Sequence, residues 1–246
     1  MIPICTSMNL KGYETYGCHM ISTYQDTGNE NPLLIQSEDE LPIKTDSLIS
    51  FAKTGWKLSY AKNPHALGLV GKSGKTSINY RFQAVKFGMK VICMTHQLLA
   101  IPDIFPGTDW ALWIDADVVY KRKLDKEFFD AVTFDQALVT YIGRTGWDHS
   151  ECGFMAFRVA HPTVRHFLQR MNKIYTTGEV FRYPEWHDSY IFDVLRTGEF
   201  SGWQWAFKNI AEGIEDMHPW PHTILGKYMD HHKGPQAKQD FYGSST

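Results

Sequence analysis

Two carboxylates stand one residue apart at the end of an apolar run, Asp115 and Asp117 in the segment 111–119 (ALWIDADVV). Strand side chains alternate between the two faces of a sheet, so a strand through this segment points both carboxylates to the same side. Carboxylates this close repel each other unless a proton or a cation lies between them. A divalent metal ion that also binds a phosphate-bearing ligand would remove the repulsion. The pair therefore predicts a metal site for a phosphorylated ligand.

The apolar run before Asp115 indicates how this pair is positioned. It is apolar at successive positions, which is typical of a central strand of a parallel sheet, buried on both faces. Open parallel sheets bind ligands at the carboxyl ends of their strands. The alternation of strand and helix patterns along the chain predicts an α/β fold with a mixed, mostly parallel sheet flanked by helices.

The remaining elements follow from periodicity and turn residues. We expect further strands over 2–6, 31–36, 137–142 and 152–157, and helices over 162–174 and 188–196 with Gly198 as a C-cap. Helical spacing also begins at Ser77, where Gly88 leaves one helix or two equally possible. Residues 57–76 have the composition of an exposed loop, and the chain from about residue 213 is predicted to be irregular.

Bulk composition narrows the class of protein. The 246 residues, 43% of them hydrophobic, suit one domain over 1–246, and the net charge of −2 argues against a dedicated nucleic-acid binder. The four cysteines show no CxxC spacing and are predicted to be reduced thiols. The first residues lack the pattern of a signal peptide, and no apolar run approaches membrane-spanning length. We therefore expect a soluble, cytoplasmic protein without a transmembrane segment.

A second motif lies near the end of the chain, in the segment 230–238 (DHHKGPQAK). Together with Asp115 and Asp117 it resembles the GT-A-fold glycosyltransferases, especially the retaining enzymes grouped with glycogenin and the bacterial galactosyltransferases, which carry a late His-x-x-Gly-Pro-like segment. The resemblance implies a GT-A-like fold and a metal site of Asp115, Asp117 and His231. Two carboxylates and one imidazole suit Mn²⁺, or Mg²⁺ as a poorer fit. His232 remains a rival ligand.

The same resemblance implies which groups meet the diphosphate of the donor. Asp115, Gly234 and Lys238 are expected there, although the lysine is displaced by one residue from the family spacing and the Pro-Trp that normally follows is missing. Arg81 and Lys86 are further candidates for the pyrophosphate, with solvated surface charge as the alternative.

Nucleoside and acceptor contacts are implied in the same way. Thr6, Ser7 and Asn9 follow the first strand and are expected to meet the nucleoside. Asp188 and Glu151 are the candidate catalytic residues, expected to orient the acceptor hydroxyl. The alternative for Asp188, shared with its neighbour Ser189, is that it caps the helix that begins there.

These observations predict a metal-dependent glycosyltransferase that moves a sugar from a UDP- or GDP-sugar to an unknown acceptor, with retention of configuration. Two other functions stay open. The letters Asp-x-Asp-x-Val also fit the nucleophile strand of haloacid-dehalogenase-like phosphohydrolases, with Asp115 as nucleophile, although no later apolar strand ends in paired acids. A non-catalytic module that binds a nucleotide sugar is the third possibility.

Overall fold

A seven-stranded sheet forms the centre of the molecule. The computed structural model describes residues 1–72, 75–144, 149–215 and 217–232 of the chain. The strand order in the sheet is β10-β8-β9-β6-β1-β2-β3. The strands are β1 Ile4–Ser7, β2 Leu33–Ser37, β3 Ile49–Lys53, β6 Trp110–Ile114, β8 Val139–Ile142, β9 Glu151–Arg158 and β10 Phe207–Asn209.

Most strand pairs in this sheet are parallel, as predicted. Strand β1 pairs in parallel with β2 and β6, β2 with β3, and β8 with β10. Strand β9 is the exception, because it runs antiparallel to both of its neighbours, β6 and β8. The strand before Asp115 is therefore central but lies in a mixed environment, between parallel β1 and antiparallel β9.

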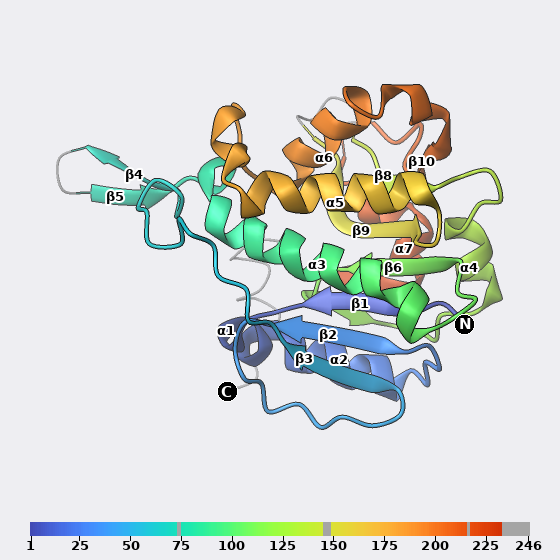
Figure 1. Ribbon diagram of the computed structural model, residues 1–246. Coiled ribbons are helices and arrows are strands. Elements are labelled where there is room, and N and C mark those ends of the chain that lie inside the picture. The colour runs from blue at the N-terminus through green and yellow to red at the C-terminus, as the bar shows by residue number, and fades with distance from the viewer. Residues whose placement is uncertain (73–74, 145–148, 216, 233–246) are drawn as a thin grey trace.

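Helices cover both faces of the sheet, so successive residues of the central strands enter two different cores. In β6, Ala111 and Trp113 pack into one core and Leu112 and Ile114 into the other. Figure 1 shows α3 and α5 lying across one face, with α2 on the opposite face. The helices are α1 Leu10–Gly12, α2 Cys18–Asp26, α3 Ala84–Ile104, α4 Lys126–Val132, α5 Pro162–Thr176, α6 Asp188–Thr197 and α7 Ile224–Tyr228.

The helical pattern that begins at Ser77 forms one continuous helix, which starts later than predicted. Helix α3 starts at Ala84, while Ile78 belongs to a strand and is 65% exposed. Gly88 does not divide the helix. A Cβ at this position would lie 2.9 Å from Leu58 Cδ1 and 3.1 Å from Tyr175 Cδ1, so the glycine admits close packing.

Two segments expected to be irregular contain regular structure. Within 57–76 and just beyond it, β4 (Leu69–Lys72) and β5 (Lys75–Ile78) form an antiparallel hairpin, which projects from the body of the molecule in Figure 1. After residue 213, α7 is followed by β11 (Met229–His231), which pairs antiparallel with β7 (Val118–Tyr120). This second pairing joins residues more than a hundred positions apart, which no local pattern can reveal.

The segment 111–119 is two strands and not one. Strand β6 ends at Ile114, residues 115–117 turn, and β7 begins at Val118. The prediction that Asp115 and Asp117 share a side through strand alternation is therefore wrong in its mechanism. They are held together by the turn and by the pairing of β7 with β11.

Helix α3 is, by length and composition alone, the one helix among the described residues that could cross a membrane. In the fold it is a core helix, because 56% of its apolar window is buried and it packs against α5 and β1. The apolar character of α3 is thus explained by burial in the protein. The absence of a membrane-spanning segment stays a prediction.

All four cysteines carry free thiols, as their spacing predicted. Cys5, Cys93 and Cys152 are buried. Burial raises the pKa of the Cys93 thiol to about 12, so this thiol is protonated and unreactive at neutral pH.

Truncating the central strand tests the importance of the two cores. Leu112 on β6 is fully buried, so Leu112→Ala should lower the free energy of unfolding by about 2–5 kcal/mol through lost transfer energy and a cavity. Leu67→Ala is the control, because Leu67 is 38% exposed and its loss should change stability by less than about 0.5 kcal/mol. Urea denaturation measures both. Equal losses for the two variants would contradict the assignment of β6 to the core.

Candidate active site

The turn after β6 places Asp115 and Asp117 at the carboxyl edge of the parallel strands. Backbone hydrogen bonds fix it on both sides. The Asp115 N–H donates to the Gly153 carbonyl at 2.8 Å, and the His232 N–H donates to the Asp117 carbonyl at 3.0 Å. These backbone hydrogen bonds hold the turn without using either carboxylate.

His231 joins this pair through the β7–β11 ladder, in which it lies opposite Val118. Its Nε2 lies 3.1 Å from Asp117 Oδ1, and one ligand atom from each of Asp115, Asp117 and His231 lies within 4.8 Å of the others. The Trp220 ring packs on the imidazole with ring centroids 4.5 Å apart, which fixes the ring. Two carboxylate oxygens and one imidazole nitrogen this close are a donor set that fits Mn²⁺ or Mg²⁺. The rival His232 instead contributes its backbone N–H to the Asp117 carbonyl.

Lys90 on α3 links the metal pair to the other side of the site. Its ammonium lies 2.7 Å from Asp115 Oδ1 and 2.8 Å from Asp188 Oδ2, and it donates to the Cys152 carbonyl at 3.1 Å. Burial alone would lower the pKa of Lys90, but the two carboxylates outweigh it and raise that pKa, so the ammonium stays charged. Sequence reasoning missed this residue. The available signal was a lysine inside the apolar pattern of α3.

Asp188 is the first residue of α6 and is almost completely buried. The helix is capped by its neighbour His187, whose Nδ1 accepts the Tyr190 N–H at 3.3 Å. The N-cap position therefore belongs to His187 and not to Asp188 or Ser189, while Asp188 Oδ1 also accepts the Ser189 N–H at 3.0 Å. Asp188 uses Oδ2 for Lys90, which places its carboxylate on the same ammonium as Asp115.

Glu151 reaches the site because β9 runs antiparallel and begins at the edge where β6 ends. Its buried carboxylate accepts the Gly153 N–H at 3.2 Å and is paired with Arg144. A Cβ on Gly153 would lie 3.0 Å from His231 Cε1 and 3.2 Å from Glu151 Oε1. Gly153 thus leaves the space in which Glu151 approaches the ring of the candidate metal ligand.

The end of β1 approaches the carboxylate pair, because Cys5 on β1 pairs with Trp113 on β6, two residues before Asp115. Burial, followed by the charges of Asp117 and Asp115, raises the pKa of Tyr16 to about 12, which places this phenol within their electric field. Ser7 ends β1, and the Thr6 carbonyl accepts a hydrogen bond from Gln97 Nε2 at 2.9 Å.

Three further residues that were predicted to contact the donor make contacts within the protein. Asn9 caps α1 through Oδ1, which accepts the Gly12 N–H at 2.7 Å. Arg81 pairs with Glu185 at 2.8 Å, and the exposed Lys86 lies over the Phe87 ring at 5.4 Å. Gly234 and Lys238 lie outside the described residues. The roles predicted for all of these residues toward a donor stay predictions.

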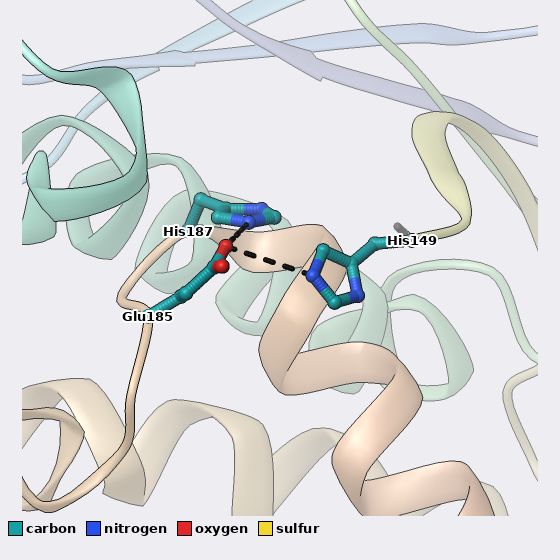
Figure 2. Close-up of side chains that lie close together, drawn as sticks. All are labelled: His149, Glu185 and His187. Atoms are coloured by element: carbon teal, nitrogen blue, oxygen red, sulfur yellow. Dashed lines mark hydrogen bonds and ion pairs between the residues drawn. The ribbon is translucent and has the colours of Figure 1, made fainter. Parts of the chain in front are cut away.

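A second cluster of possible metal ligands, His149, Glu185 and His187, borders Asp188 (Figure 2). Glu185 Oε2 lies 2.8 Å from His187 Nε2 and 3.6 Å from His149 Nε2. Because His187 Nδ1 accepts a backbone N–H, Nε2 of the neutral ring carries the proton and donates to Glu185. Arg81 occupies the other oxygen of Glu185. The hydrogen bonds therefore indicate a polar cluster whose groups bond to one another and hold the start of α6.

Comparisons with known proteins support the fold. No protein-family model matches the chain, and no curated protein matches its sequence. The solved structure of the galactosyltransferase LgtC, in complex with donor and acceptor sugar analogues, aligns with 100% of this chain and 97% of its own, at 12% identity and a TM-score of 0.53. A glycosyltransferase involved in glycosylation of the major capsid of PBCV-1 aligns over 97% of this chain and 98% of its own, at 14% identity and a TM-score of 0.49. At such low identity the LgtC match shows the fold alone, and it confirms the predicted GT-A-like fold.

Removing the ammonium between the carboxylates should destabilise the protein. In Lys90→Met, Asp115 and Asp188 lose the ammonium that they share, and we expect a loss of about 2–3 kcal/mol in the free energy of unfolding. This is below the range for fully buried pairs, because the Asp115 side chain is 24% exposed and solvent screens it. Chemical denaturation measures the loss, and Mn²⁺ should restore part of it. Lys126→Met, which breaks the exposed Lys126–Asp130 pair, is the control and should leave stability unchanged.

The buried cap should make stability depend on pH. Burial lowers the pKa of His187 below its ordinary value of 6.5, against the opposing effect of Asp188 and Glu185, so the folded ring stays neutral where the unfolded ring binds a proton. The neutral His187 ring therefore makes its full contribution to the free energy of unfolding above about pH 6.5. This contribution is lost as the pH falls below that value. Urea denaturation gives the free energy of unfolding at about pH 8 and about pH 5.5. The difference between these two values should be smaller for His187→Asn, which keeps a capping side chain, than for wild type. An identical difference in the two proteins would contradict the role of His187.

Proposed function

We propose that the protein is a metal-dependent glycosyltransferase that moves a sugar from a nucleotide-diphosphate sugar to an acceptor. The observation that carries the proposal is the convergence of Asp115, Asp117 and His231 within 4.8 Å at the carboxyl edge of a GT-A-like sheet. That edge is where open α/β sheets bind their ligands. The LgtC structure holds donor and acceptor sugar analogues on the same fold, which supports a two-substrate site here.

The three residues would hold a divalent cation, Mn²⁺ or Mg²⁺. Such a cation supplies electrostatic stabilisation of the negative charge that develops on the departing diphosphate. Lys90 supplies a fixed positive charge beside the same carboxylate, already desolvated and oriented by three partners. A charge oriented before the reaction needs no reorganisation during it, which is where such groups contribute most.

The acceptor side of the site is supplied by two carboxylates on different elements. Asp188 at the start of α6 and Glu151 at the start of β9 would accept hydrogen bonds from the acceptor hydroxyl and orient it. Both are buried, and each is paired with a cation, Lys90 or Arg144, whose charge balances that of the carboxylate. Retention of configuration is proposed from the sequence resemblance.

The structure adds no support for the phosphohydrolase alternative. Asp115 does follow a central strand, but no later apolar run of the sequence ends in the paired acids that this class requires, and the full-length fold match is to a glycosyltransferase. The non-catalytic alternative differs from our proposal in turnover alone. Both alternatives are therefore outcomes of the experiment below.

Donor binding should depend on both the metal and Asp117. We expect titration calorimetry to show binding of UDP or GDP in the presence of Mn²⁺ and little binding with chelator. Asp117→Asn should weaken it roughly 100-fold, or about 2.7 kcal/mol. Asp230→Asn is the matched control, since Asp230 lies next to His231 on β11 but is exposed and pairs with Lys121.

Other outcomes separate the alternatives. Metal-dependent binding followed by slow hydrolysis of the matching nucleotide sugar supports the transferase, since water can replace the acceptor. Binding without any turnover supports the non-catalytic module. A folded protein that binds no nucleotide but releases phosphate from phosphomonoesters would sink the proposal in favour of the phosphohydrolase.

A further inference from the structure

A polar cavity of about 300 Å³ opens beside the acceptor side of the site. It lies between the ends of β8 and β10 and the outer turns of α6. The lining residues are Tyr141, Gly143, Arg144, His149, Ser150, Asp193, Arg196 and Asn209. His149 connects it to the proposed catalytic residues, because its ring contacts that of His187, the cap of the helix that starts at Asp188. The ring centroids lie 5.1 Å apart and the planes are inclined by 55° (Figure 2).

The Asp193 carboxylate and the Asn209 amide oxygen of this cavity already accept hydrogen bonds within the protein. Asp193 accepts the Ser150 N–H and hydroxyl, each at 2.7 Å, and the Arg196 guanidinium at 2.9 Å. Asn209 Oδ1 accepts the N–H groups of Gly143 at 2.7 Å and of Ala211 at 2.9 Å. The carboxylate and the amide oxygen therefore serve to build the cavity.

Several hydrogen-bond donors of the cavity remain for a ligand. Arg196 uses Nε and Nη2 for Asp193, and among the described residues no partner is seen for its Nη1 or for Asn209 Nδ2. Arg144 pairs with Glu151, which is not part of the lining, and burial lowers the pKa of Arg144, so a further anion would stabilise its charge. Guanidinium groups offer paired N–H donors in a plane, which suit carboxylate and phosphate oxygens.

We propose that this cavity binds an anionic group of the acceptor, a carboxylate or a phosphate, through Arg144, Arg196 and Asn209. The inference rests on the proposed glycosyltransferase function and names the class of its acceptor, an acidic or phosphorylated sugar. A volume of about 300 Å³ is at the small end for ligand pockets, which suits one sugar unit. Helix α6 carries Asp188 and Arg196 on one rigid element, so an anion on Arg196 would fix the acceptor relative to Asp188.

The experiment measures the binding of glucuronic acid, glucose 6-phosphate and glucose to the full chain by ligand-observed NMR, with UDP and Mn²⁺ titrated separately. We expect at least one of the anionic sugars to bind at least tenfold more tightly than glucose, and the better of the two identifies carboxylate or phosphate. Arg196→Gln should abolish this preference and leave UDP binding unchanged.

Arg122→Gln is a closely matched control. Arg122 pairs with Asp125 three positions away at 3.0 Å and lies 4.4 Å over the Tyr228 ring. Arg196 likewise pairs with Asp193 three positions away at 2.9 Å and lies 4.9 Å over the Tyr141 ring. Arg122 lies outside the cavity, so its variant should keep the preference for anionic sugars.

Equal binding of glucose and the anionic sugars, or binding of none of them by a protein that binds UDP and Mn²⁺, overturns the inference and leaves the proposed function standing. Binding of an anionic sugar that Arg196→Gln removes, in a protein that does not bind UDP, leaves an anion site but contradicts the transferase. An equal loss of anion binding in Arg122→Gln would show a general charge effect and would also overturn the inference.

Discussion

The rest of the site is arranged around the mutual repulsion of four carboxylates, which cations must compensate. Asp115, Asp117, Glu151 and Asp188 come from three separate elements and meet at one edge of the sheet. Like charges at short range in a partly dry site cost several kcal/mol unless they are compensated. Lys90 pairs with two of them and Arg144 with a third. Asp117 faces the His231 ring, and that is the position where a divalent cation would add the largest compensation.

The direction of one strand makes this meeting possible. Because β9 is antiparallel, its first residue lies at the edge where β6 and β8 end. Glu151 and Gly153 thereby enter a site otherwise built from carboxyl ends, and the Gly153 carbonyl accepts the Asp115 N–H. A fully parallel sheet would have placed Glu151 at the opposite edge. The antiparallel strand thus brings Glu151 close to Asp115, Asp117 and His231, the candidate metal ligands.

Local patterns in the sequence predicted many of the helices and strands, and the family resemblance suggested the three candidate metal ligands. Neither revealed what long-range contacts provide. The apolar run before Asp115 and the periodicity of α5 and α6 were sufficient for their strand and helices, because those signals are contained in neighbouring residues. The break between β6 and β7 was missed because Val118 and Val119 continue the apolar run. Their partner strand, β11, lies far along the chain, so no neighbouring residue indicates it. Lys90 was missed for a related reason. A lysine on an apolar helix face is read as solvated until the facing carboxylates are known.

In the proposed transferase, helix α6 would link the binding of the acceptor to the positions of both candidate catalytic carboxylates. Its first residue, Asp188, is held by Lys90. Its capping residue, His187, is held by Glu185, which in turn pairs with Arg81. Further along the same helix, Asp193 anchors Ser150, the residue before Glu151. The two candidate acceptor-orienting carboxylates are therefore tied to one rigid element, Asp188 directly and Glu151 through Ser150. A ligand that binds Arg196 shares that element, so its position would be set relative to both carboxylates without any movement of the sheet.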